Sequence, residues 1–538
     1  MGILKIGHER AAPRPSHWRP FLGLPSGQFF TDIINMSSSI PSAESPAPSV
    51  MDTGGIGGHP RGLTTLFFTE MWERFSYYGM RALLILFMVK TAADGGLGYD
   101  TKKAAAIYGT YTMSVYLLSI LGGFIADNFI GARRSVLIGG IIIACGHFTM
   151  AFSAQSTFFA GLVLIALGTG LLKPNISTMV GSLYSPTDER RDAGFSIFYM
   201  GINIGAFLAP LVTGYLAQSA SWKAQLTSWG FDPVHSWHWG FAAAGVGMTF
   251  GLVMYVLQRE RLAQVGHAPV AENNQGRPWG KLALVALGSL ALIAAMKASD
   301  QYPALVYVLF GLQIAAILFF AFKPTADSKR IAAILVFFFA AEIFWAIFEQ
   351  TGSTISLFAD NLTRNEILGQ SFPSSWWQSL NSIWVILLAP VFAFLWITLG
   401  PKQPSSPMKF VLGLLFVALS FVLMVPAAKL TAEGKVGPLW LVGLFFLQTV
   451  GEMLLSPVGL STMTKLAPQR LLGMVMGIWF LAAALGNKLA GVLAGEFKSD
   501  NADQLATFFW HQALAVGACT LVLFALVPWV KKLMGGVR

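Results

Sequence analysis

The sequence predicts an all-α integral membrane protein with fourteen transmembrane helices. Of its 538 residues, 54% are hydrophobic and only 12% are charged, which is about half the charged fraction of an average soluble protein. Residues 104–126 and 367–401 contain no Asp, Glu, Lys or Arg, and each stretch exceeds the roughly 18 residues that cross a bilayer as a helix. Continuous apolar runs such as 136–143 exclude an outer-membrane barrel, whose strands alternate apolar and polar residues.

The helices fall into two groups of six with a pair between them. Charge-free runs, loop charges and Gly or Pro positions place the first six near residues 63–92, 104–127, 133–153, 156–179, 189–218 and 237–258. A polar linker at 267–278 precedes the pair, near 279–297 and 302–322. The last six lie near 329–358, 373–399, 408–427, 437–466, 469–495 and 505–532. This order is typical of the major facilitator fold, in which substrate sites lie near the midplane between two six-helix bundles.

These ranges predict four parts of the chain. Residues 1–60, rich in Pro, Ser and Gly, are expected to form a disordered tail. An N-terminal bundle is expected at 61–260, a linker with an inserted transmembrane hairpin at 261–328, and a C-terminal bundle at 329–538. Loops between the spans are short, so function is expected to lie within the membrane.

The net charge of +10 is explained by topology and not by a nucleic-acid partner. The basic residues lie in alternate loops, as the positive-inside rule requires of cytoplasmic loops. They include Arg133 and Arg134, Arg190 and Arg191, Arg259 and Arg261, Lys329 and Arg330, Lys402 and Lys409, and Lys531 and Lys532. Both termini are therefore expected in the cytoplasm, although Lys102 and Lys103 lie in an opposite loop and the orientation depends on the sum of the charges.

The sequence carries no motif of an enzyme, an ATP-driven pump or a metal site. HExxH, GxSxG, Walker A and paired CxxC patterns are all missing. We therefore expect no enzymatic activity, no cofactor and no metal.

The first helix carries charges that a membrane span normally avoids. Glu70, Arg74, Tyr77 and Arg81 fall within roughly 60° of one another at about 100° per residue, with Glu73 beside them. Each charge at a helix centre costs about 2.5 to 3.5 kcal/mol, so such residues usually face a cavity or a partner. The alternative is an interfacial belt of snorkelling charges and aromatic rings.

Five ionisable residues interrupt four other spans. These are Lys173, Glu342, Glu349, Glu452 and Lys488. Acids and bases on different helices can pair, and a pair that forms in one conformation only acts as a gate. For Glu342 and Lys488 a structural pair or an interfacial position is the simpler interpretation.

Five segments resemble the proton-dependent oligopeptide transporter (POT/PTR) family of the major facilitator superfamily, bacterial type. The string from Glu70 to Gly79 matches the family pattern ExxERFxYYG. The others are GGFIADNFIGARR at 122–134, FSIFYMGINIGAF at 195–207, WWQSLN at 376–381 and GEMLLSPVGLS at 451–461. The resemblance covers nearly the whole chain from residue 63, and the extra pair at 279–322 fits bacterial members.

The resemblance implies a proton-coupled importer of di- and tripeptides in the bacterial inner membrane, working as a monomer with the proton as coupling ion. By motif, Lys173 and Arg81 would hold the peptide carboxylate, and Asn203, Asn381 and Glu349 its amino group. The aromatic residues Tyr77, Tyr78, Tyr116 and Trp479 would line the cavity, although ordinary helix packing also explains aromatic residues.

Within this family frame the charges suggest a mechanism. Glu70, Glu73 and Arg74 form the expected proton site. Arg81 is expected to pair with Glu349 and close the outside, and Lys173 with Glu452 to close the inside. Two alternatives stay open: the same fold carrying another small solute, such as nitrate or a peptide-like drug, and a membrane-embedded enzyme or channel.

Overall fold

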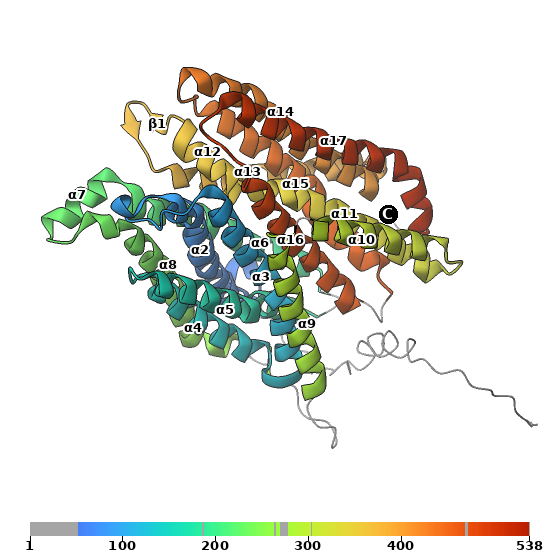
Figure 1. The fold of residues 1–538 in the computed structure, drawn as a ribbon. Coiled ribbons are helices and arrows are strands. Elements are labelled where there is room, and N and C mark those ends of the chain that lie inside the picture. The colour runs from blue at the N-terminus through green and yellow to red at the C-terminus, as the bar shows by residue number, and fades with distance from the viewer. Residues whose placement is uncertain are drawn as a thin grey trace, which may run out of the picture. The chain divides into compact units, whose positions relative to one another are not determined.

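The computed structural model describes residues 52–185, 188–262, 265–268, 278–302, 304–468 and 472–536, and this part of the chain is almost entirely helical (Figure 1). Twelve of its helices are long and apolar enough to cross a membrane. Two further long helices, α2 and α4, pack among them. The all-α membrane fold is thereby confirmed, and these fourteen segments coincide with the fourteen predicted ones.

Six long helices make up the first bundle, coloured blue to green in Figure 1. They are α2 (Arg61–Val89), α3 (Thr101–Ile125), α4 (Ala132–Met150), α5 (Gln155–Ser182), α6 (Arg191–Gln218) and α8 (Ser236–Leu257), with the short α7 (Ala220–Ser228) after α6. Helix α2 packs closely against α6 because Gly205 has no side chain: a Cβ there would lie 2.1 Å from the carbonyl oxygen of Met71.

Two helices form the inserted hairpin between the bundles in sequence, α9 (Trp279–Ala298) and α10 (Ala304–Phe322). Helix α9 packs on α3, and α10 packs on α11 (Ala326–Phe348). The hairpin therefore contacts helices of both bundles.

The second bundle contains α11 and six further helices. These are α12 (Thr354–Leu362), α13 (Ser379–Leu399), α14 (Ser406–Leu430), α15 (Leu439–Leu466), α16 (Leu472–Ala494) and α17 (Ala502–Leu533). The predicted continuous helix at 329–358 is wrong in one respect: the chain breaks between α11 and α12. The break is the 3₁₀ segment η6 (Glu349–Gly352) followed by Ser353, whose φ of −128° and ψ of −85° are not helical.

Short elements connect the long helices. They are η1 (Ile56–Gly58), η2 (Ala92–Asp94), the π-helical turn η3 (Ala126–Ile130), η4 (Pro233–His235), η5 (Arg259–Leu262), η7 (Ser374–Gln378), η8 (Gly400–Lys402) and η9 (Thr431–Glu433). The only described strands, β1 (Glu366–Ile367) and β2 (Gln370–Ser371), form a small antiparallel hairpin after α12.

The helix ends define two opposite faces. On the face that we call the Lys90 face, Tyr99 bonds to the end of α2, and His238 at the start of α8 bonds to the end of α4 with 3.0 Å between its Nδ1 and the Met150 carbonyl. On the other, the Arg133 face, the Arg133 guanidinium lies 2.6 Å from the carbonyl oxygen of Arg259. Successive helices thus run in alternating directions between the two faces.

Residues 52–60, the described end of the predicted tail, make hydrogen bonds to the first bundle. The His59 ring lies 2.8 Å from the Tyr184 hydroxyl, and Arg190 donates to the Gly58 carbonyl at 3.0 Å. The same guanidinium bonds to Asp188 and lowers the pKa of that loop carboxyl. Residues 1–51 of the predicted tail lie outside the described residues.

Candidate functional site

Helix α2 buries one arginine between two glutamates. Arg74 Nε lies 3.1 Å from Glu70 Oε1, one helical turn away, and a second guanidinium nitrogen contacts Glu73. All three side chains are buried. One guanidinium cannot neutralise two carboxylates, and within the described residues Glu70 Oε2 and Glu73 Oε1 have no hydrogen-bond partner. The three residues therefore form a buried cluster with two acids in direct contact with one base, and Lys173 is a further cation that interacts electrostatically with both carboxylates.

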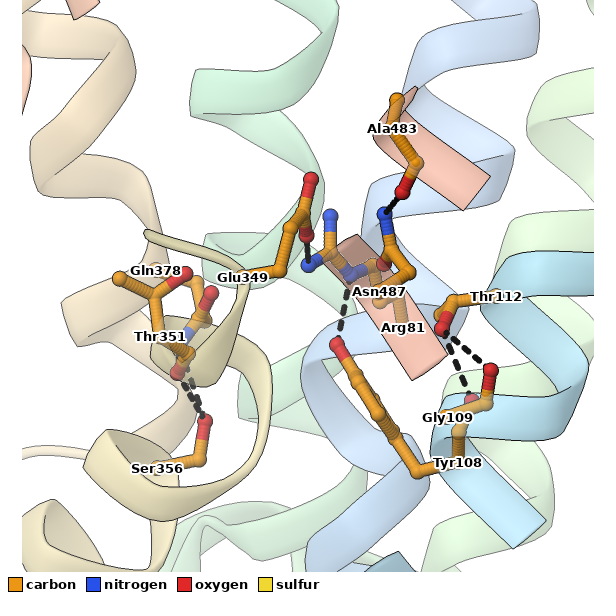
Figure 2. A network of polar contacts seen from close by, with 10 residues as sticks. All are labelled: Arg81, Tyr108, Gly109, Thr112, Glu349, Thr351, Ser356, Gln378, Ala483 and Asn487. Carbon is orange, nitrogen blue, oxygen red and sulfur yellow. Dashed lines mark hydrogen bonds and ion pairs between the residues drawn. The ribbon is translucent and has the colours of Figure 1, made fainter. Parts of the chain in front are cut away.

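A second buried cluster joins the two bundles (Figure 2). The Arg81 guanidinium on α2 contacts the carboxylate of Glu349 at the start of η6. Its Nε also donates to the hydroxyl of Tyr108 on α3, at 2.6 Å. The predicted contact between Arg81 and Glu349 is therefore present, and Tyr108 is a third member that the sequence analysis did not identify.

The break between α11 and α12 makes this second cluster possible. A Cβ at Gly352 would lie 1.8 Å from the Tyr108 hydroxyl oxygen and 3.2 Å from Arg81 Nε. Only glycine therefore leaves room for the tyrosine and the arginine beside Glu349. The chain then restarts as α12, whose Asp360 forms an ion pair of 2.8 Å with Lys90 at the end of α2.

The predicted ion pair between Lys173 and Glu452 is absent from this structure. Lys173 Nζ lies 3.8 Å above the centre of the Tyr116 ring. Glu452 Oε2 accepts a hydrogen bond of 3.0 Å from Asn381, which also donates to Thr449 at 3.1 Å. The two charges thus have separate partners, each within its own bundle.

The remaining predicted residues are spread over both bundles. Tyr77 and Tyr78 contact each other edge to face at 5.3 Å, and Arg74 lies 5.4 Å from the Tyr77 ring. Asn203 donates to a backbone carbonyl of its own helix α6. The Trp479 ring packs against Gly459 of α15. Asn203 and Trp479 therefore make no polar contact with the other predicted site residues that the structure describes.

Polar contacts between the bundles gather toward the Lys90 face. Besides Arg81–Glu349 and Lys90–Asp360, the second half of α6 bonds to η7 and to the start of α13. These bonds run from Gln218 to Ser374 at 3.0 Å, from the Trp376 ring to the Leu211 carbonyl at 3.1 Å, and from Ser379 to the Phe207 carbonyl at 2.8 Å. In the described part of the chain no hydrogen bond or ion pair joins α5 to α15 nearer the Arg133 face. The structure is therefore closed at the Lys90 face.

Tyr108 and Thr449 are the site residues that sequence reasoning missed. Tyr108 precedes Tyr116 by eight residues on α3, so the two lie roughly 80° apart around that helix. Thr449 lies three residues before Glu452, a spacing that also faces one side. In both cases the missed residue lies near the same side of its helix as a predicted site residue, and that helical spacing could have predicted it.

Comparisons with known proteins agree with this geometry. The model of the POT family matches residues 133–510. The peptide transporter YePEPT of Yersinia enterocolitica is 41% identical over 507 residues, which cover 89% of this chain and 96% of that protein. A di-/tripeptide transporter of Lactococcus lactis subsp. cremoris is 37% identical over 503 residues, covering 89% and 98%.

Solved structures give the same result. A mutant of the peptide transporter POT in complex with alafosfalin superposes with a TM-score of 0.78 at 40% identity, covering 90% of this chain and 98% of that one. A POT family transporter in complex with 5-aminolevulinic acid has a TM-score of 0.77 at 29% identity, covering 89% and 99%. The likeness therefore extends over both bundles.

Proposed function

The chain belongs to the POT family, a multi-pass membrane transporter family with bacterial members, and from this premise we propose that it imports di- and tripeptides together with protons by alternating access. Two relatives named as peptide and di-/tripeptide transporters support the cargo. The observation that carries the proposal is the pair of opposite charges on facing bundles, Arg81 and Glu349, beside a further cation, Lys173.

A zwitterionic peptide fits such an arrangement. Its carboxylate and amino group stand at a nearly fixed spacing whatever the side chains, so charged groups on opposite walls recognise the backbone alone. Lys173 lies over the Tyr116 ring and is the proposed contact of the peptide carboxylate, with Arg81. Glu349, Asn203 and Asn381 are proposed to receive the amino group, and Tyr77, Tyr78, Tyr116 and Trp479 to contact the side chains.

The proton is proposed to bind at Glu70 or Glu73. Each has a buried carboxylate oxygen without a described partner, and Arg74 is the cation in direct contact with both, with Lys173 as a second, more distant one. Protonation removes the cost of burying the second charge. The cluster and the peptide site are joined through α2, which carries Arg74 and Arg81 two turns apart.

The two gates are proposed to alternate. Arg81 and Glu349 hold the Lys90 face closed, and Lys173 and Glu452 would pair when the Arg133 face closes instead. Breaking a buried pair costs about 3 to 5 kcal/mol, so protonation of Glu349 or capture of Arg81 by a peptide carboxylate shifts the balance between the two forms by orders of magnitude.

The proposed orientation places the Arg133 face and both termini in the cytoplasm of a bacterium, with the protein as a monomer in the inner membrane. Arg133, Arg190 and Arg259 all lie at that face, as the positive-inside rule requires. In intact cells a membrane-impermeant maleimide is expected to label Thr227→Cys on α7, at the Lys90 face. Labelling only after the cells are opened would reverse the orientation.

Uptake of radiolabelled dialanine into proteoliposomes tests the cargo and the coupling. We expect accumulation under an inward proton gradient and none after a protonophore collapses it. Dialanine with an acetylated amino group and an amidated carboxyl should compete about 10- to 150-fold more weakly for each blocked charge, because a hydrogen bond to a charged group contributes about 1.5 to 3 kcal/mol. Equal competition by the blocked peptide would refute the zwitterion argument.

The proton site is tested separately. Glu70→Gln should keep the exchange of labelled for unlabelled dialanine but lose gradient-driven accumulation, since the amide cannot carry a proton. Glu496→Gln, an exposed acid after α16, is the matched control and should behave as the parent. Gradient-driven accumulation by the Glu70→Gln variant would show that the proton binds elsewhere. It would not affect the assignment of peptides as the cargo.

A further inference from the structure

Two fully buried charges lie where the second bundle meets the inserted hairpin, and the hairpin supplies a polar partner to each. Lys488 Nζ on α16 forms an ion pair of 2.6 Å with Asp300, which follows α9. Glu342 on α11 accepts a hydrogen bond of 2.9 Å from Gln313 on α10. Lys488 and Glu342 are both 0% exposed. The two do not pair with each other, so the hairpin is what makes these charges tolerable inside a membrane protein.

Lys488 also reaches the first bundle. Its Nζ donates to the Thr110 hydroxyl on α3 at 3.0 Å. One ammonium group therefore joins three segments that lie far apart in sequence: α3 of the first bundle, α16 of the second, and the turn of the hairpin.

The same helices touch backbone to backbone one turn away. A Cβ on Gly491 of α16 would lie 2.6 Å from the Cα of Gly109 on α3, and one on Gly109 would lie 2.8 Å from the Cα of Gly491. This close approach belongs to the set of contacts that close the Lys90 face. In the alternating access proposed above, opening of that face separates α3 from α16 and breaks the bond between Thr110 and Lys488.

We propose that Lys488 is a positioning residue for the transport cycle, and that Asp300 of the inserted hairpin sets how easily the α3–α16 contact opens. Asp300 keeps the buried ammonium paired in both forms, so opening removes only the hydrogen bond to Thr110. The hairpin thus supplies the counter-ion of a buried lysine at the α3–α16 contact, which opens and closes during transport. This inference rests on the alternating access proposed above, and it assigns a role to a segment that lies outside both bundles.

The proposal predicts opposite effects for the two partners of Lys488. Thr110→Val removes only the bond that is specific to the closed form, so the open fraction should rise, on the order of tenfold or more for a hydrogen bond to a charged donor. Asp300→Asn weakens the ion pair that persists in the open form. The bond from the ammonium to Thr110, which exists only in the closed form, then contributes relatively more to stability, so the open fraction should fall. A merely structural role would shift both variants in the same direction.

Distances between spin labels measure this balance without any substrate. The labels are placed on Thr227→Cys of α7 and Ala432→Cys of η9, two exposed positions at the Lys90 face on different bundles, after replacement of the free Cys145 and Cys519 by serine. The fraction of long distances is compared for the parent, Thr110→Val and Asp300→Asn. Lys281→Met, which removes an exposed lysine from the opposite end of α9, is the matched control and should match the parent.

The distance distributions of these variants test the proposed roles of Lys488 and Asp300. Opposite shifts of Thr110→Val and Asp300→Asn, with Thr110→Ser restoring the parent distribution, support the proposal. Shifts in the same direction, or parent-like distributions in both, overturn it. A variant that fails to fold is recognised by its thermal unfolding, and the Thr110→Val and Thr110→Ser pair then decides alone. Failure of the parent to take up dialanine would refute the transport function but leave the distance result readable.

Discussion

Gly352→Ala is expected to weaken the closure of the Lys90 face. The new methyl carbon would lie 1.8 Å from the Tyr108 hydroxyl oxygen, whereas ordinary contact begins at 3.4 Å, so about 1.6 Å (3.4 − 1.8) must be recovered by movement. Tyr108 is 0% exposed and bonded to Arg81, so its rigid ring has little room to move. The backbone at Gly352 is not in a left-handed conformation, so the effect arises from the clash alone.

The magnitude follows from the cost of overpacking a buried site, about 1 to 3 kcal/mol. Because the clash exists only when η6 lies against α3, it raises the free energy of the closed form and not that of the open form. The ratio of open to closed molecules should therefore rise about 5- to 150-fold. The spin-label pair at positions 227 and 432 reports this ratio, and gradient-driven dialanine uptake reports its consequence.

A double-mutant cycle with Tyr108→Phe identifies the contact responsible. Tyr108→Phe alone removes a bond within the first bundle that orients Arg81 toward Glu349, so it should favour opening only by weakening the Arg81–Glu349 contact between the bundles. In the double variant the hydroxyl that clashes is gone, although the ring carbon at 2.8 Å stays close, so relief is partial. We expect the combined effect to fall short of the sum by about 0.5 to 3 kcal/mol. Strict additivity, or an unchanged distance distribution in Gly352→Ala, would refute this reasoning.

Three further predictions use the same assays. Gly491→Ala should force α3 away from α16, because its methyl group meets the Cα of Gly109 at 2.6 Å, and should abolish the closed distance; retention of that distance would contradict the packing argument. Lys90→Met should change the open fraction less than about fivefold, since a partly exposed pair with Asp360 contributes about 0 to 1 kcal/mol; a hundredfold change would make this pair a main gate. Gly205→Ala should lower the unfolding temperature and leave the open-to-closed ratio intact, because α2 and α6 belong to the same bundle. A changed ratio with normal stability would contradict the argument that contacts within one bundle do not affect opening.

The sequence alone determined the class of fold and most of its segments. Length, apolarity and loop charge are local properties, and a bilayer requires each span to satisfy its own backbone hydrogen bonds. The cluster of Glu70, Glu73 and Arg74 was equally accessible, because helical periodicity fixes which neighbours share a face. The break at 349–353 was missed, since a short polar segment with one glycine does not by its composition distinguish a broken helix from a continuous one.

Which buried acid contacts which buried base follows from the packing of the helices and not from the sequence. The expected partner of Lys173 was Glu452, but Lys173 lies over the Tyr116 ring instead. Lys488 bonds to Asp300 and Thr110. The two contacts of Lys488 join residues 188 and 378 positions apart in the chain. Coulomb attraction makes any acid a suitable partner for any base, so the sequence names the candidates, and the packing of the helices in one conformational state selects among them.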